Sequence, residues 1–241
     1  MPQKVMPSRP ELRQARLLAR DALDRAGTLA FKPVSSAKWV DVQTLRSGAI
    51  RVRIEHDTIR GVTPEMMVWW FENLASTTTW NGVDFAGPEV SLYHLWHHRD
   101  HIAVTPLTDG PGGRPNRGFA PGATSRIDEQ FNDFHDRIHA TVLTTCLDEE
   151  EFTFEVRQYG QTVGRIIHTY RPERDGLAFY AETQIGFDSG VRRLGNLFRP
   201  FVYSTRTAEN WIRHNIEETG RSEHVIPVLY RRAMDTATAK S

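Results

Sequence analysis

Cysteine is almost absent from this chain of 241 residues, and neither sign of charge is in excess. Cys146 is the single thiol, so an intrachain disulfide and a thiolate metal cluster are both excluded. It lies in a segment that reads as a strand, where we expect a structural thiol rather than a nucleophile. Thirty basic residues balance thirty acidic ones, which disfavours a dedicated binder of nucleic acid or of anionic membranes.

Long hydrophobic runs are missing as well. No segment reaches the length of a membrane helix, and no hydrophobic secretory core follows the N-terminus, so we expect a cytoplasmic protein. The chain also lacks a Gly-x-Ser-x-Gly elbow and an apparent Cys–His pair, which gives covalent acyl transfer little support. Between residues 106 and 124 there are five glycines, but prolines interrupt them and no phosphate-binding fingerprint results.

The first 35 residues differ in pattern from the rest. Residues 9–26 carry one apolar stripe among charges, which predicts an amphipathic helix, and residues 32–38 read as a linker. We therefore expect a helical arm over residues 1–35 that packs on the body or on a second subunit. The remainder, residues 36–241, is expected to form one catalytic domain.

The pattern of that domain predicts an α+β fold. Residues 50–59 alternate as a half-buried strand, Thr63 and Pro64 open a helix, and residues 90–96 read as another strand. A long loop over 106–124 precedes consecutive strands at 125–131, 137–147, 151–158, 162–170 and 176–186. A helix from about residue 200 to 218, closed by Gly220, follows. Strands in succession before a long helix indicate a curved antiparallel sheet that grips the helix.

That last helix carries the first candidate site. His214 and Glu218 are four residues apart and share a helix face with Trp211. An imidazole and a carboxylate at this spacing can hold one metal ion, although a surface His–Glu pair has the same spacing.

A histidine cluster supports the metal interpretation, since four of the ten histidines fall between residues 94 and 101. If residues 90–96 form a strand, His97 shares a face with Tyr93 and Leu95, and His94 lies opposite with Trp96. A solvated loop or a hydrogen-bonded core histidine is the alternative for each member of the cluster.

Glu129 is the third element of the candidate site. Alternation places it with Ile127 and Phe131 on the apolar face, while Asp128 is expected to face outward. A carboxylate on an apolar face needs a cation or a metal. Two histidines and two carboxylates without cysteine suit zinc or another divalent transition metal. A rival set consists of His135 and His139 with Glu129 or Asp128.

These motifs together resemble a known family. The pieces are Tyr93-x-x-Trp96-His97-x-x-Asp100-His101, a downstream glutamate, Trp211-x-x-His214-x-x-x-Glu218 and Val228-Leu-Tyr230. In this order, across residues 50–230, they resemble the 2,4-diacetylphloroglucinol hydrolase and phloretin hydrolase family. The chain departs from the family pattern at His98, where the family has proline, and at Val104, where an asparagine can contact the phenolic substrate.

The resemblance implies a Bet v 1-like helix-grip domain and an N-terminal segment that helps to form a homodimer. It also implies a zinc ion whose ligands, matched by motif, are His101, Glu129, His214 and Glu218. The side chains expected to line the substrate pocket and to exchange protons there are Tyr93, His168 and Tyr180.

The expected activity is zinc-dependent hydrolysis of the carbon–carbon bond between an acyl group and a polyhydroxylated aromatic ring. The metal would lower the pKa of a water molecule and polarise the acyl oxygen. Trp69, Trp70 and Trp96 are expected to stack on the ring. A non-enzymatic carrier of apolar ligands and a metal-dependent oxygenase with iron at the same ligands remain as alternatives.

Overall fold

The computed structural model describes residues 31–81, 83–131, 136–187, 196, 203 and 205–239. The predicted helix over residues 9–26 and most of the predicted arm lie outside this range. The described end of the arm packs on the body: the ring of Phe31 stacks on that of His97, and Lys32 forms ion pairs with Asp57 and Glu223.

The described elements alternate short helices with strands before five long strands and one long helix. In chain order they are η1 (Val34–Ser36), β1 (Trp39–Thr44), β2 (Ile50–Glu55), β3 (Ile59–Arg60), α2 (Pro64–Asn73), β4 (Thr77–Thr79), β5 (Glu89–Ser91), α3 (Leu92–Trp96), β6 (His101–Pro106), η2 (Pro111–Gly113), β7 (Thr124–Phe131), β8 (Asp136–Leu147), β9 (Glu151–Gln158), β10 (Gln161–Glu173), β11 (Gly176–Ile185) and α4 (Thr205–Thr238).

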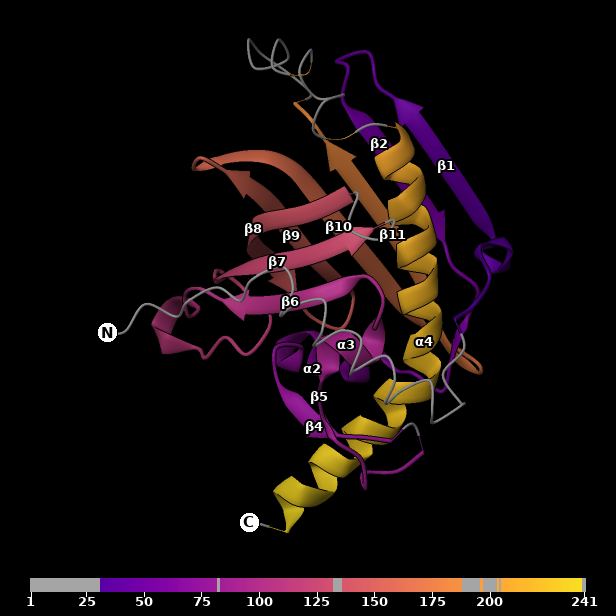
Figure 1. Ribbon diagram of the computed structural model, residues 1–241, viewed down its shortest axis with the longest axis vertical. Helices are drawn as coiled ribbons and strands as arrows, with labels where there is room; N and C mark the ends of the chain where they lie inside the picture. Colours follow the sequence, from indigo (N-terminus) through magenta and orange to yellow (C-terminus); the bar gives the residue numbers. More distant parts are fainter. Residues whose placement is uncertain are drawn as a thin grey trace.

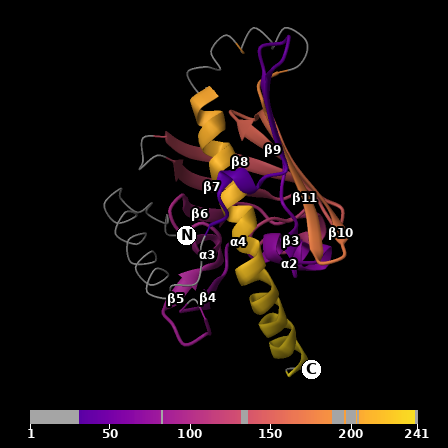
Figure 2. The ribbon, with the colours of Figure 1, turned by 90° about the vertical axis from the view of Figure 1, so that its right-hand side faces the viewer.

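One antiparallel sheet and the helix α4 make up the main layers. The strands follow the order β1-β2-β11-β10-β9-β8-β7-β6, with β3 beside β11, and β4 and β5 form a separate pair. The sheet curves around α4, with β6 to β8 on one side of the helix and β10 and β11 on the other (Figures 1 and 2). The molecule therefore has the predicted α+β, Bet v 1-like helix-grip fold.

The strands form where alternation predicted them, within a few residues at each end. In β2 the side chains of Ile50, Val52 and Ile54 are almost fully buried, while the residues between them are more exposed. The turn between β9 and β10 has positive φ at Tyr159 and Gly160, as tight two-residue hairpins require. This turn joins the two strands that alternation placed at 151–158 and 162–170.

Two predictions need correction, one about the strand at residues 90–96 and one about the end of the last helix. Residues 90–96 are not one strand: β5 ends at Ser91, whose hydroxyl accepts a hydrogen bond from the Tyr93 N–H and begins α3. The predicted end of the last helix at Gly220 is also wrong, since α4 continues through Gly220 and Pro227 to residue 238. Gly220 is retained inside the helix because a Cβ there would lie only 2.6–2.9 Å from side-chain atoms of Lys32.

The tryptophans of α2 take a different place from the one predicted. Thr63 caps the helix and Pro64 begins it, as expected. Trp70 is fully buried and packs edge-on against Trp96, and Trp69 packs against Tyr230. Neither Trp69 nor Trp70 reaches the central cavity described below, so of the three tryptophans only Trp96 can contact a ligand there.

No helix in the described part of the chain is both long enough and apolar enough to cross a membrane.

Candidate metal centre

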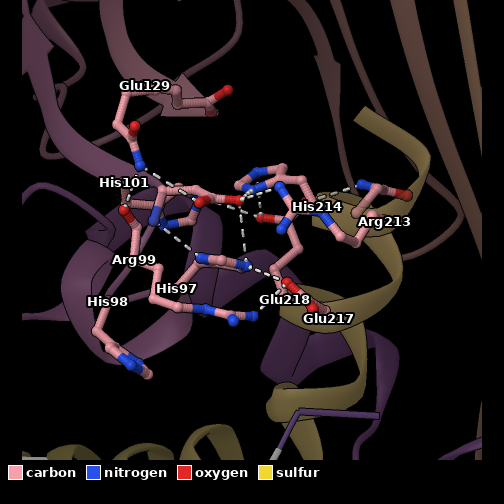
Figure 3. A network of polar contacts seen from close by, with 12 residues as sticks. His97, His98, Arg99, His101, Glu129, Arg213, His214, Glu217 and Glu218 are labelled. Atoms are coloured by element: carbon pink, nitrogen blue, oxygen red, sulfur yellow. Dashed lines mark hydrogen bonds and ion pairs between the residues drawn. The ribbon is translucent and has the colours of Figure 1, made fainter. Parts of the chain in front are cut away.

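The four predicted ligands converge where the sheet edge meets α4. His101 begins β6 and is paired in register with Glu129 of β7, while His214 and Glu218 lie one turn apart on α4. The Nε2 atoms of His101 and His214 lie 3.2 and 3.6 Å from the same oxygen of Glu218. Ligand atoms of His101, Glu129 and His214 all lie within 4.8 Å of one another. Figure 3 shows the side chains of His101, His214 and Glu218 directed toward one another.

His101 is oriented as a metal ligand would be. Its Nδ1 lies 2.6 Å from the backbone oxygen of Tyr93, so this nitrogen donates to the carbonyl. Its Nε2 is buried and makes no hydrogen bond to any described group. A neutral imidazole that donates from one nitrogen presents a lone pair on the other. The cluster therefore contains a nitrogen lone pair that makes no hydrogen bond and faces the other candidate ligands.

His214 is supported from behind by a carboxylate. Its Nδ1 lies 3.2 Å from Asp100, which leaves Nε2 facing Glu218. Burial alone would lower the pKa of His214, but the carboxylates of Glu218, Asp100 and Glu129 outweigh burial and raise that pKa to about 9. A histidine whose second nitrogen donates to a carboxylate is the usual arrangement around a protein-bound metal.

Without a cation, burial disfavours the charged form of both glutamates. Burial raises the pKa of Glu218 to about 8, although His214 opposes the rise, and burial also raises the pKa of Glu129. The Glu129 carboxylate accepts a 2.5 Å hydrogen bond from the Tyr93 hydroxyl. Burial and the adjacent Glu129 raise the pKa of Tyr93 well above its usual value, so this phenol stays protonated. A divalent ion would offset the cost of burying these carboxylates in their charged form, and the donor set therefore fits zinc.

The neighbouring histidines have other partners. His97 accepts a hydrogen bond from the Asp100 N–H at Nδ1, and its Nε2 lies 3.0 Å from Glu217. A second cluster of possible ligand atoms, formed by His97, Asp100 and His214, is thus accounted for by hydrogen bonds. His98 points away from the cluster, and its Nδ1 lies 2.6 Å from Arg221 (Figure 3).

Two members of the rival ligand set, His139 and Asp128, contact each other but stand apart from the cluster around His214. His139 lies 2.5 Å from Asp128, with its side chain 57% exposed, and neither belongs to the cluster around His214. His135 lies outside the described residues. Asp128 lies with Arg126 on the face of β7 away from the cavity, as expected, but it is only 3% exposed because Arg126 and His139 contact its carboxylate.

An apolar cavity of about 270 Å³ lies between the sheet and α4 and reaches the cluster. Glu129, His214 and Glu218 form one part of its wall, and Trp211 lines it on the same helix face, as predicted. The aromatic side chains that line the rest are Phe71, Trp96, Phe119, Phe152 and Phe154. The candidate metal centre therefore opens onto a pocket of the size and character that suits an aromatic ligand.

Two of the three predicted pocket residues lie where they were expected, and one does not. Tyr93 and His168 line the cavity. Burial lowers the pKa of His168 to about 4, and its Nδ1 has no hydrogen-bond partner among the described groups. Tyr180 lies on the outer face of the sheet, between buried Phe179 and Ala181, and its hydroxyl donates to Glu182. The prediction for Tyr180 was wrong because alternation along β11 turns it away from the cavity.

Several residues that support the cluster were not singled out from the sequence. Asp100 was present in the quoted motif but was given no role. Asn215 and Thr183 line the cavity, and Asn215 also contacts His56. Nothing in the spacing of residues 56 and 215 indicates that the fold brings them together.

Comparisons with known proteins add little beyond this geometry. No family model and no curated protein matches the chain. Among solved structures, protein Ms6760 from Mycobacterium smegmatis is similar with a TM-score of 0.42 and 11% identity, over 76% of this chain and 95% of that one. Protein NE0264 from Nitrosomonas europaea gives 0.39 and 13%, over 74% and 96%. The di-domain ARO/CYC BexL from the BE-7585A biosynthetic pathway gives 0.42 and 14%, over 75% of this chain and 51% of that one. The fold assignment above rests on the strand order and on α4.

Proposed function

We propose that this protein is a zinc-dependent hydrolase that cleaves the carbon–carbon bond between an acyl group and a polyhydroxylated aromatic ring. Substrates resembling 2,4-diacetylphloroglucinol or phloretin are the class we favour. The observation that carries the proposal is the buried cluster of two histidines and two glutamates in the wall of an aromatic cavity.

The proposed ligands are His101, Glu129, His214 and Glu218. Two imidazoles and two carboxylates suit zinc, and the buried Nε2 of His101, which faces a Glu218 oxygen at 3.2 Å without a hydrogen bond, supports the presence of an ion. When bound, zinc would make a water molecule more acidic and would polarise an acyl oxygen.

The overall reaction adds water across the acyl–ring bond. The acyl carbon gains hydroxyl and becomes a carboxylic acid, while the ring carbon gains a proton and leaves as the deacylated phenol. A ring carbanion is a poor leaving group, so protonation of that carbon must accompany bond cleavage. The protein therefore has to orient the ring and exchange protons with it.

The cavity provides side chains for both tasks. Phe71, Trp96 and Phe152 offer aromatic faces and edges for packing against a ring. Tyr93 remains protonated and holds Glu129. His168 is neutral near pH 7, and its unpartnered Nδ1 is our candidate for hydrogen bonding and proton exchange with a phenolic oxygen.

Elemental analysis is the first test. We expect about one zinc per chain in the purified protein and loss of that zinc in a His214→Ala, Glu218→Ala double variant. A double variant at His224 and Glu209, both exposed on the same helix, is the matched control and should retain zinc. Iron in place of zinc would favour the oxygenase, and absence of metal after reconstitution would favour a non-enzymatic carrier.

An activity assay then separates the remaining candidates. Acylated polyphenols should yield equal amounts of carboxylic acid and deacylated phenol without consumption of dioxygen. Glu218→Ala should abolish turnover and most of the metal binding, and an active, metal-replete Glu218→Ala protein would contradict the proposed site. The proposal also includes a cytoplasmic homodimer, and light scattering during size-exclusion chromatography tests the dimer.

A further inference from the structure

The two oxygens of Glu218 have different surroundings. One oxygen faces the Nε2 atoms of His101 and His214, where the proposed ion would lie. The other oxygen accepts a 2.7 Å hydrogen bond from the side-chain amide of Asn215. Asn215 is 2% exposed, so water does not compete for this contact.

The amide of Asn215 is itself held in one orientation by His56. The Nε2 of His56 donates to the Asn215 carbonyl oxygen over 3.1 Å, and His56 is only 4% exposed. His56 follows β2 and is fixed there by its backbone bond to Phe179 and by edge-on contact with the Phe179 ring. Burial lowers the pKa of His56 to about 3, so its ring is neutral and carries a single N–H.

The two contacts use both ends of the Asn215 amide. An asparagine side chain has one accepting end and one donating end. The accepting oxygen faces His56, which places the N–H of the neutral ring on Nε2, and the donating NH2 group faces Glu218. The chain of contacts therefore runs from the sheet through Asn215 to one oxygen of a proposed ligand.

We propose that Asn215 and His56 are positioning residues that restrict Glu218 to a single ligating oxygen and thereby set the zinc affinity of the cluster. This inference rests on the proposed zinc site and assigns a role to residues outside the ligand set. Groups that orient a metal ligand contribute to affinity because the ligand need not be ordered when the ion binds.

Zinc affinity measured by competition with a chromophoric chelator tests the role of Asn215. Asn215→Leu should weaken zinc binding roughly 10- to 100-fold, the usual effect of removing such a contact. Asn210→Leu is the matched control, since Asn210 lies on the same helix and donates to Asp136. It should bind zinc like the wild-type protein.

Variants of His56 separate positioning from general stability. His56→Gln retains an N–H donor and should keep near-wild-type affinity, whereas His56→Leu should weaken binding. Adding His56→Leu to Asn215→Leu should cause little further loss, because both changes interrupt one chain of contacts. Circular dichroism verifies that each variant is folded.

The outcomes are distinct. Wild-type affinity in folded Asn215→Leu, with only a lower melting temperature, would overturn the inference and leave the zinc site intact. Equal losses from His56→Leu and His56→Gln, or an additive loss in the His56→Leu, Asn215→Leu double variant, would also overturn it. Failure of the wild-type protein to bind zinc would overturn the proposed function, and the positioning role with it.

Discussion

At the scale of single residues, the hydrogen-bond partners of the two ring nitrogens distinguish a candidate metal ligand from a histidine that only supports the cluster. His101 donates from Nδ1 to a backbone carbonyl and turns Nε2 toward Glu218 without a hydrogen bond, whereas both nitrogens of His97 have hydrogen-bond partners. The sequence contains both residues in one motif and does not distinguish them, because their partners come from other elements. Glu217 of α4, which contacts His97, is 120 positions away.

His168 gives a prediction about stability and pH. Its pKa is about 4 in the folded protein because burial disfavours the charged ring, against an ordinary value of 6.5. Between these values the unfolded chain binds more protons, so stability rises with pH and is lost as the pH falls from about 6.5 to about 4. We expect His168 to account for about 3 kcal/mol of that loss.

Denaturant titrations of wild type and His168→Leu at several pH values measure this contribution. The difference in unfolding free energy between pH 7 and pH 4 should be smaller in the variant by about 3 kcal/mol. His224→Leu, at an exposed position on α4, is the control and should behave like the wild type. An unchanged pH dependence in His168→Leu would show that His168 is not buried as a neutral ring.

At the scale of elements, the long strands and the start of α2 could be predicted, whereas the start of α3 and the end of α4 could not. Alternation identified β2 and β7 to β11 because one face of each packs on the core. The start of α3 was missed because the mostly apolar residues 90–96 favoured a strand over the helix that the Ser91 cap begins. The extent of α4 was missed because Gly220 and Pro227 usually end helices, and only the packing of Lys32 explains the glycine.

Gly220 gives a prediction that reverses the ordinary rule. Alanine normally stabilises a helix interior by about 1 kcal/mol relative to glycine. Here the new Cβ would lie within 3 Å of three Lys32 side-chain atoms, including its Cβ. Lys32 cannot swing away freely because Asp57 and Glu223 hold its ammonium group. Gly220→Ala should therefore destabilise the protein by about 1–2 kcal/mol in thermal or chemical unfolding.

The same substitution in a Lys32→Gly background is the control for that explanation. Without the lysine side chain the clash is absent, so Gly220→Ala should become neutral or stabilising by up to about 1 kcal/mol. A similar destabilisation in both backgrounds would place the cause elsewhere in the helix.

At the scale of the whole molecule, the fold brings the four candidate ligands together from β6, β7 and α4, and a third strand, β2, leads to the supporting His56. The sequence indicated the ligand types and their order, since His214 and Glu218 are one helical turn apart. It did not indicate the supporting layer, because His56 and Asn215 are 159 positions apart. The metal role of the cluster remains a prediction until an ion is measured.

Proton release tests that role for the assembled molecule. In the metal-free protein the carboxylates of Glu218, Asp100 and Glu129 raise the pKa of His214 to about 9, and burial raises that of Glu218 to about 8, so the pair holds at least one proton near pH 7. Zinc requires a neutral imidazole and a carboxylate, and binding must expel the protons that the pair holds. We expect release of one to two protons per zinc near pH 7, and an apparent affinity that rises as the pH increases toward about 9.

Titration calorimetry in buffers with different ionisation enthalpies measures the number of protons released. The observed enthalpy should vary linearly with buffer enthalpy, with a slope of one to two protons per zinc. Glu218→Gln removes one of the two titrating groups and should reduce this slope by about one, alongside weaker binding. A slope near zero in the wild-type protein would mean that the cluster does not lose protons to the ion. Zinc would then be bound at another site, and the buried protons of His214 and Glu218 would serve only the fold.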